Sequence, residues 1–313
     1  MGTDNFSTQV TSAGVPRPGG PGLLGGRTVS RVGYGAMQVR KLRDDRGAAI
    51  ALLHRAAELG ADHIDTAYFY GDGVVNELIG EAFGPGDGIT VVSKVGAEPD
   101  PGGRIPLRLA QRPEQLRASV EDNLRSLGTE QVPVVNLRRT DGGPGLRATG
   151  DQVVGLDDQL AVMTAMRDEG TIGAIGLSSV SLDVLRRAVP AGIACVQNAY
   201  NLVARDDEDI LRLCAAEGIA WVPYFPLGGA YPGMPKVTDE PAIRAAASAL
   251  GRTPSQVGLA WLLRHSPSVL LIPGTADPRH LQENIDAASI TLDDATLKEL
   301  DAVPSRSAEV PLA

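Results

Sequence analysis

Lys94 and Asp65 are the residues whose type and position point first to chemistry. Lys94 is one of only four lysines against 25 arginines, and it follows the apolar pair Val91-Val92. Asp65 follows Ile64 at the end of another apolar run. Because acids are rarely buried without a partner, Asp65 needs a cation, and Lys94 is the natural candidate. A lysine there can be a Schiff-base nucleophile, a buried charge or a group that shifts a neighbour's pKa, whereas a snorkelling surface lysine is the alternative without function.

Tyr70 lies in the loop after Asp65 and is the candidate proton donor. A phenol with an ordinary pKa of about 10 is a poor acid at neutral pH, but a nearby ammonium stabilises the phenolate and lowers that pKa. Asp65, Tyr70 and Lys94 are therefore predicted to form one proton-delivery unit. Packing or pocket lining is the expected role of Tyr68 and Phe69 in the same loop.

Two alternating patterns along the chain must position these residues. Short apolar runs rich in Val and Ile end in polar residues, and each precedes a longer stretch with helical spacing. The strand-like runs span residues 29–34, 62–65, 90–94, 132–137, 174–177, 194–197, 220–224 and 269–272. The helical stretches span 46–59, 74–83, 113–127, 156–169, 181–188, 206–217, 240–250, 254–264, 277–288 and 293–302. Eight such units predict an α/β fold, a closed (β/α)8 TIM barrel with its active site at the C-terminal face.

An open doubly wound sheet is the competing topology, and it requires a glycine-rich fingerprint after the first strand. The chain offers only Gly33-Tyr34-Gly35, which lacks the third glycine. The barrel is therefore the predicted fold. We expect residues 1–28 to form a flexible N-terminal tail and residues 29–313 to form a single domain, because one such barrel takes about 250 residues.

Composition narrows the classes of function. The chain is 43% apolar and 21% charged, which is typical of a globular protein, and its net charge of −9 argues against a nucleic-acid or anionic-membrane partner. It contains no apolar run long enough to cross a membrane, and its first residues lack the apolar segment of a signal peptide. Cys195 and Cys214 fall in apolar runs, as core cysteines do in a reducing compartment. We expect a cytoplasmic monomer, and no metal site is predicted.

Several ordered motifs resemble those of the aldo-keto reductase family. The run GADHIDTAYFYG at residues 60–71, followed by NELIG at 76–80, is similar to the family signature. Further strand ends agree with it: Ser93-Lys94, Gly176-Leu177-Ser178, Gln197-Asn198, Pro226-Leu227-Gly228, Pro273-Gly274-Thr275 and Glu283-Asn284. The resemblance covers residues 29–303 and is strongest to the bacterial branch related to pyridoxal reductases. It implies a barrel that binds NADPH and reduces a small aldehyde or ketone to an alcohol.

The resemblance also implies roles for individual residues. Asp65, Tyr70 and Lys94 fill three of the family's four catalytic positions, and the family's histidine aligns with Arg138. An arginine keeps its proton and offers several donors, whereas histidine titrates near neutral pH. Arg138 is therefore expected to bind the carbonyl oxygen and stabilise its developing negative charge.

The cofactor contacts implied by the resemblance are carried over position by position. Ser178 and Gln197 hold the nicotinamide amide, and Tyr224 stacks on its ring. NADPH is expected over NADH, because Arg279 and His280 can pair with a 2′-phosphate. The full set of expected cofactor residues is Gly35, Met37, Asp65, Ser178, Gln197, Tyr224, Leu227, Gly228, Gly274, Thr275, Arg279, His280, Glu283 and Asn284.

Arg138 also leaves two alternatives to a reductase. One is a barrel that keeps the cofactor but acts as a sensor or partner subunit, and the other is a lyase or cyclase that uses the same tyrosine without net reduction. The presence of Asp65, Tyr70 and Lys94 argues against a site without turnover, since such a site needs none of them.

Overall fold

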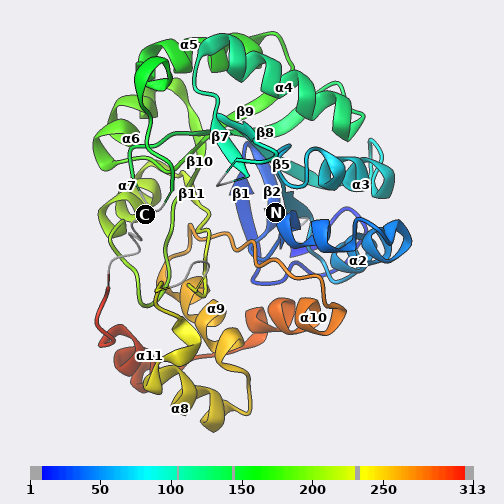
Figure 1. Ribbon diagram of the computed structural model, residues 1–313. Helices are drawn as coiled ribbons and strands as arrows, with labels where there is room; N and C mark the ends of the chain where they lie inside the picture. Colours follow the sequence, from blue (N-terminus) through cyan, green and yellow to red (C-terminus); the bar gives the residue numbers. More distant parts are fainter. Residues whose placement is uncertain (1–8, 104–105, 143–144, 230–232, 307–313) are drawn as a thin grey trace, which may run out of the picture.

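The computed structural model describes residues 9–103, 106–142, 145–229 and 233–306, and its centre is a curled parallel sheet (Figure 1). The sheet contains, in order, β3 (Tyr34–Gly35), β4 (His63–Asp65), β5 (Thr90–Val95), β8 (Val132–Arg138), β9 (Ile172–Ser178), β10 (Ile193–Gln197) and β11 (Ala220–Trp221). Strands that are neighbours in space are therefore neighbours in the chain, apart from a hairpin between β5 and β8. This is the order expected of a β/α barrel.

The predicted eighth strand, 269–272, closes the sheet through bridges to both of its edges. Val269 pairs with Trp221 of β11, and Leu271 pairs with Val32, just before β3. The Leu271 main chain donates to the Arg31 oxygen and accepts from the Gly33 nitrogen, both at 2.8 Å. The two edges are thus joined, and the predicted barrel is confirmed.

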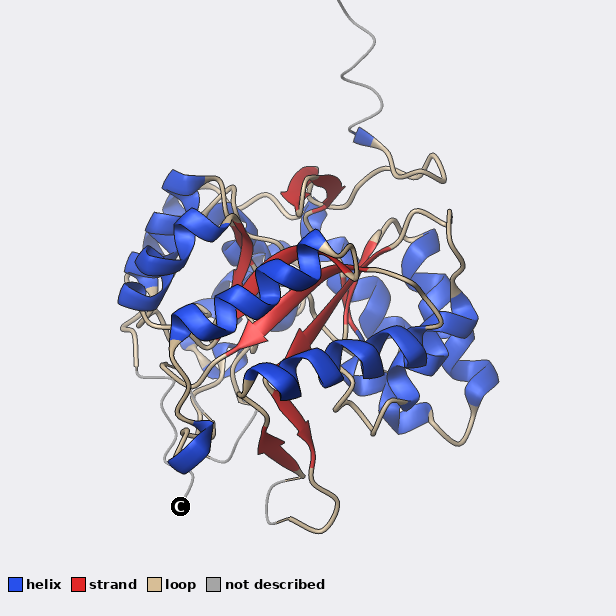
Figure 2. Cartoon of the chain, turned by 90° about the horizontal axis from the view of Figure 1, so that it is seen from above, coloured by secondary structure: helices blue, strands red, loops and turns tan. Residues whose placement is uncertain are grey.

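The helices surround the strands (Figure 2). They are α2 (Arg46–Glu58), α3 (Val74–Ala82), α4 (Pro113–Leu127), α5 (Leu156–Asp168), α6 (Leu182–Ala188), α7 (Glu208–Glu217), α8 (Pro241–Leu250), α9 (Pro254–His265), α10 (Pro278–Asp286) and α11 (Asp294–Asp301). Each lies within two residues of its predicted bounds. In α9, Pro254 occupies the first turn, and Thr253 and Gln256 form a reciprocal capping box. Within the described part of the chain, no helix combines the length and the apolar character of a membrane span.

A hairpin at the N-terminal end of the barrel departs from the sequence-based expectation. Strands β1 (Pro21–Leu24) and β2 (Arg27–Ser30) pair across the turn Gly25-Gly26, within and beyond the stretch 1–28 that was expected to be a tail. Both turn glycines have positive φ, which suits the tight turns that join antiparallel strands. Leu24 and Val29 are buried with apolar side chains of the barrel interior. This burial explains why the segment is ordered. The first barrel strand, β3, begins at Tyr34 rather than at residue 29, because Val29 belongs to the hairpin.

A second hairpin, β6 (Ala97–Pro99) and β7 (Leu107–Leu109), follows β5 and was not predicted. Glu98 and Arg108 lie opposite each other in it and form an ion pair of 2.7 Å. The segment reads as a Gly- and Pro-rich loop in the sequence because each strand has only three residues. It extends the chain beyond the end of β5, beside the residues predicted to be catalytic.

Candidate active site

The ends of β4 and β5 bring Asp65 and Lys94 into direct contact, as the sequence predicts. Lys94 Nζ donates to Asp65 Oδ1 at 2.5 Å and to the main-chain oxygen of Thr66 at 2.9 Å, and both side chains are buried. Burial lowers the pKa of Lys94, but the Asp65 carboxylate and Tyr70 raise it further, so the net shift is upward. Lys94 is therefore an ammonium at neutral pH. The ion pair with Asp65 favours the role of a buried charge over that of a Schiff-base nucleophile, which starts from a neutral amine.

Tyr70 lies beside this pair in the loop after β4. Lys94 Nζ lies 5.1 Å from the centroid of the Tyr70 ring. Burial raises the pKa of Tyr70 most strongly, while Lys94 and Arg138 lower it and Asp65 raises it, so the net shift is upward. The expected effect of the ammonium is thus present but is outweighed by burial. Tyr70 consequently holds its proton at neutral pH and can donate it to a stronger base that forms beside it.

Gln197, at the end of β10, makes a further contact with Asp65. Its Nε2 donates to Asp65 Oδ2 at 2.7 Å, and its Oε1 is buried without a hydrogen-bond partner in the described structure. Leaving a buried polar atom unpaired costs about 1–3 kcal/mol. The free oxygen is therefore a ready acceptor for an N–H of a bound molecule. This fits the expected contact of Gln197 with the nicotinamide amide.

Arg138 ends β8 and differs sharply from the arginine beside it. Its guanidinium is half-buried, and its Nη1 is buried without a hydrogen-bond partner among the described residues. Arg139, in contrast, donates to Asp141 through Nε at 2.6 Å and Nη2 at 3.1 Å, and also to Gln159. The protein therefore engages the guanidinium of Arg139 in hydrogen bonds, whereas that of Arg138 retains a free donor close to Tyr70.

A buried polar network lies behind the Asp65–Lys94 pair. Asn76 of α3 accepts from Thr66 Oγ1 at 2.8 Å and donates to Asn123 of α4 at 2.9 Å and to Ser126 at 3.0 Å. Asn123 Oδ1 also accepts from Ser93 Oγ at 2.5 Å. Thr66 directly follows the site aspartate, and Ser93 directly precedes the site lysine. The network therefore ties the ends of β4 and β5 to the two helices that pack against them.

Sequence reasoning missed this network, although it left a signal. Asn76 and Asn123 fall on the apolar faces of their helices, where a polar side chain needs a buried partner. His63 was missed as well: it is buried on β4 with both ring nitrogens unpartnered in the described structure. Burial lowers the pKa of His63, so the ring is neutral. A Cβ on Gly33 would lie 2.3 Å from its Nε2, and His63 thus fills the space that Gly33 leaves open.

The other expected cofactor residues lie at strand ends and in the segments that follow them. Gly35 ends β3, Met37 lies in the 3₁₀ helix η1 (Ala36–Leu42), and Ser178 ends β9. Tyr224, Leu227 and Gly228 follow β11, and Gly274 and Thr275 follow the closing stretch 269–272. The remaining four, Arg279, His280, Glu283 and Asn284, lie in α10. The Tyr224 hydroxyl lies 3.2 Å from Ser179 Oγ. Ser179 and Phe225 have positive φ, an uncommon backbone conformation for such residues that concentrates at functional sites.

Packing accounts for two of the expected cofactor glycines. A Cβ on Gly228 would lie 2.1 Å from the Pro235 oxygen, and one on Gly274 would lie 2.4 Å from the Gly35 oxygen. The close approach that requires glycine at these positions is between segments of the chain itself.

The two residues expected to bind a 2′-phosphate contact an acid. Arg279 Nη2 lies 3.2 Å and His280 Nδ1 4.0 Å from Asp277 Oδ2. Asp277 also caps α10 by accepting from the Arg279 main chain at 2.8 Å, and this bond is the largest cause of the lowered pKa of Asp277. Because both basic side chains are exposed, their pairing with Asp277 is weak and leaves them accessible to a phosphate.

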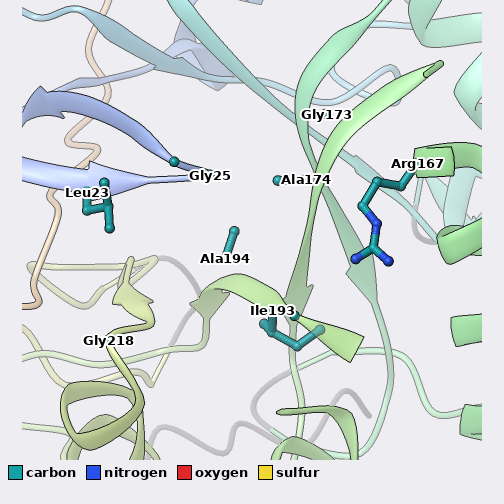
Figure 3. Close-up of a pocket in the computed structure, with 10 residues that line it drawn as sticks. Leu23, Gly25, Arg167, Gly173, Ala174, Ile193, Ala194 and Gly218 are labelled. Carbon is teal, nitrogen blue, oxygen red and sulfur yellow. The ribbon is translucent and has the colours of Figure 1, made fainter. Parts of the chain in front are cut away.

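A separate pocket of about 350 Å³ lies at the opposite, N-terminal end of the barrel (Figure 3). It is bounded by the β1–β2 turn at Gly25 and by the first residues of β9 and β10, and small residues form most of its wall. Its charged residue, Arg167, donates to the Ala191 oxygen at 2.7 Å. The predicted catalytic and cofactor residues do not line this pocket, so it is not part of the candidate active site.

Comparisons with known proteins agree with this geometry. The model of the Aldo/keto reductase family matches residues 31–304. The chain is 41% identical over 288 residues to the pyridoxine 4-dehydrogenase of Escherichia coli (strain K12), covering 90% of this chain and 96% of that protein. It is 34% identical over 301 residues to an uncharacterized oxidoreductase of Schizosaccharomyces pombe, covering 94% and 93%. A solved aldo-keto reductase from Klebsiella pneumoniae, in complex with NADPH, superposes with a TM-score of 0.75 at 26% identity, covering 91% of this chain and 95% of that one.

These matches confirm the predicted barrel and the resemblance drawn from the strand-end motifs. They favour an oxidoreductase over the two alternatives that Arg138 suggested, a sensor subunit and a lyase or cyclase.

Proposed function

Because the chain belongs to the aldo-keto reductase family and is an NADPH-dependent carbonyl reductase, we propose that Tyr70 is its proton donor and that its substrate is an aldehyde of the pyridoxal class. The overall reaction converts the aldehyde, NADPH and a proton to the alcohol and NADP⁺. The observation that carries the proposal is the buried contact of Asp65 with Lys94, which holds an ammonium against the phenol of Tyr70.

Bound NADPH supplies the hydride to the carbonyl carbon. Tyr70 donates its phenolic proton to the carbonyl oxygen, whose basicity rises as negative charge develops on it. The Lys94 ammonium stabilises the phenolate that Tyr70 becomes, and Asp65 holds that ammonium in place. The proton and the positive charge are thus in position before the substrate binds.

The expected cofactor contacts include one polar atom that the described structure leaves unpaired. Gln197 Oε1 can accept from the nicotinamide amide, and Ser178 ends the adjacent strand. Arg279 and His280 would meet the 2′-phosphate. The proposed pyridoxal class of substrate is supported by the name of the Escherichia coli relative and by the unpartnered Nη1 of Arg138, since pyridoxal carries an oxygen anion beside its aldehyde.

The test compares Tyr70→Phe with Tyr68→Phe, which makes the same chemical change two residues away. NADPH oxidation is followed by absorbance with pyridoxal and with benzaldehyde, and cofactor affinity by fluorescence titration. Tyr70→Phe should lose at least ~10²-fold in kcat with unchanged cofactor affinity, the usual contribution of a general acid, whereas Tyr68→Phe should stay near wild type. Wild-type turnover in Tyr70→Phe would remove Tyr70 as the donor, and an absence of pyridoxal turnover in the wild type would remove the substrate class.

Two further expectations remain predictions. The protein is expected to be a monomer, which light scattering coupled to size-exclusion chromatography can check. It is expected to act in the cytoplasm without a nucleic-acid partner, in line with its net charge of −9.

A further inference from the structure

We propose that Arg138 forms a subsite for an oxygen anion carried by the substrate close to the reacting carbonyl, so that the enzyme selects aldehydes with a phenolate or carboxylate beside the aldehyde. This inference rests on the proposed function and assigns to Arg138 a role in substrate choice in addition to any effect on the proton.

The first observation is a half-buried cation with one buried nitrogen that has no partner among the described residues. Nη1 of Arg138 is buried and unpartnered, and no carboxylate of the described residues pairs with this guanidinium. Removing a cation from water without an anion is costly, so such groups are normally paired. Arg139 shows the usual outcome, since Asp141 and Gln159 together engage its guanidinium. The missing partner of Arg138 is therefore expected to come from a ligand.

The second observation is that the protein holds Arg138 in place through its main chain. Gln111 Nε2 donates to the Arg138 oxygen at 2.8 Å and to the Gly96 oxygen at 2.6 Å. Gln159 in turn donates to Gln111 Oε1 at 3.0 Å. A Cβ on Gly145 would lie 3.1 Å from Nη2 of Arg138, so Gly145 also lies close to the guanidinium. The position of the arginine is thus built by several elements, as expected of a binding group.

The third observation concerns location. Arg138 lies between the strand of Lys94 and the strand of Ser178, and its charge acts on the Tyr70 phenol. Leu227 and Gly228, which the family resemblance implies pass under the cofactor pyrophosphate, follow β11, three strands away in the sheet. The anion that reaches Arg138 is therefore carried by the substrate rather than by the cofactor phosphates. Arginine suits this task because its planar fork matches oxygen anions and never loses its proton.

The experiment measures kcat/KM for benzaldehyde, 4-carboxybenzaldehyde, 2-carboxybenzaldehyde and pyridoxal in wild type, Arg138→Lys and Arg138→Met. Arg138→Met should lose about 10–100-fold more with 2-carboxybenzaldehyde and pyridoxal than with benzaldehyde, the usual worth of a hydrogen bond to a charged group. Arg138→Lys should recover part of that loss because it keeps the charge without the fork. The para isomer should follow benzaldehyde, since its carboxylate lies on the far side of the ring.

Arg138→His adds a readout that a merely structural role would not move. The preference for 2-carboxybenzaldehyde over benzaldehyde should be present at pH 5.5 and lost at pH 8, because histidine loses its charge at a pH of about 6.5. In the wild type the same preference should not change with pH, since arginine stays charged. A pH-independent preference in Arg138→His would overturn the proposal.

Further outcomes decide against the subsite. An equal loss of kcat/KM with all four aldehydes would mean that Arg138 acts on proton transfer or on local structure. An equal loss with the ortho and para isomers would indicate a general attraction of negative charge. Binding of benzoate to the NADP⁺ complex, followed by protein fluorescence, tests the subsite even if no aldehyde is turned over. Unchanged benzoate affinity in Arg138→Met would overturn the proposal, while failure of turnover alone would count only against the proposed function.

Discussion

Asn123→Ala is the substitution that best tests how the barrel holds Asp65 and Lys94, the proposed catalytic pair. Asn123 Oδ1 accepts from Ser93 Oγ at 2.5 Å and from Asn76 Nδ2 at 2.9 Å. After the substitution, Asn76 keeps its bond to Ser126, whereas the Ser93 hydroxyl loses its acceptor in a buried site. One unsatisfied group and the lost bonds together should cost about 2–4 kcal/mol in the free energy of unfolding.

The effect on turnover follows from the position of Ser93 in the chain. It directly precedes Lys94, so a shift at Ser93 displaces the ammonium from Tyr70, and a misplacement of about 1 Å can cost ~10²-fold in rate. We expect kcat to fall at least ~10-fold at a temperature where the variant is folded, with little change in the KM for NADPH. Ser126→Ala is the matched control, because it removes another bond of Asn76 but does not adjoin the pair. It should lower stability and leave kcat near wild type.

The assay is a double-substitution cycle on urea unfolding, together with steady-state kinetics. Ser93→Ala combined with Asn123→Ala removes both partners, so the double variant should be more stable than the sum of the single losses predicts by about 1 kcal/mol. Additivity within about 0.5 kcal/mol would refute the hydrogen bond as a source of stability. Full kcat in Asn123→Ala would refute the link between this network and the position of Lys94.

Three other substitutions test the charges of the site and of the fold. Lys94→Met should lower kcat by at least ~10²-fold and cost about 3–5 kcal/mol of stability, because it leaves a buried carboxylate unpaired; wild-type stability by urea unfolding would contradict this. Arg279→Ala should raise the Kd for NADPH about tenfold and leave that for NADH unchanged in fluorescence titrations, since only NADPH carries the 2′-phosphate; a parallel change in both would place the arginine elsewhere. Burial raises the pKa of Glu208, but hydrogen bonds from Tyr200 and His265 lower it further, to a net value below the ordinary 4.5. The stability that this depressed pKa contributes is present above pH 4.5 and is lost as the pH falls below it, so Tyr200→Phe should flatten the decline of the melting temperature in acid.

The repeating pattern of the chain predicted most of the fold, because alternation between strands and amphipathic helices is a local property. Every predicted helix appears within two residues of its bounds, and the predicted stretch 269–272 closes the barrel through bridges at Val269 and Leu271. The two hairpins were missed for different reasons. β1–β2 owes its order to the burial of Leu24 and Val29 in the barrel, which is a long-range contact. β6–β7 is too short to show alternation.

The candidate site shows the same division between local and long-range information. Asp65, Lys94 and Gln197 could be placed together because parallel strands bring their carboxyl ends to one face. The pKa of Tyr70 could not be predicted from its charged neighbours, since the burial that dominates it depends on the whole fold. The unpaired Nη1 of Arg138 could not be predicted either. The sequence shows two adjacent arginines, but it does not show that Asp141 pairs with Arg139 rather than with Arg138.

The charges gathered around Tyr70 explain why an arginine at position 138 changes the chemistry of the site. Lys94 and Asp65 form a pair of opposite charges in direct contact, so their fields largely cancel at a distance. Arg138 then leaves an excess positive charge that no described carboxylate neutralises, and this charge cannot titrate away as that of a histidine can. Developing negative charge on the carbonyl oxygen reduces that excess, as does an oxygen anion on the substrate. In the proposed mechanism the same arginine therefore stabilises the transition state of any aldehyde and, through its extra donors, favours those aldehydes that bring a second anionic oxygen.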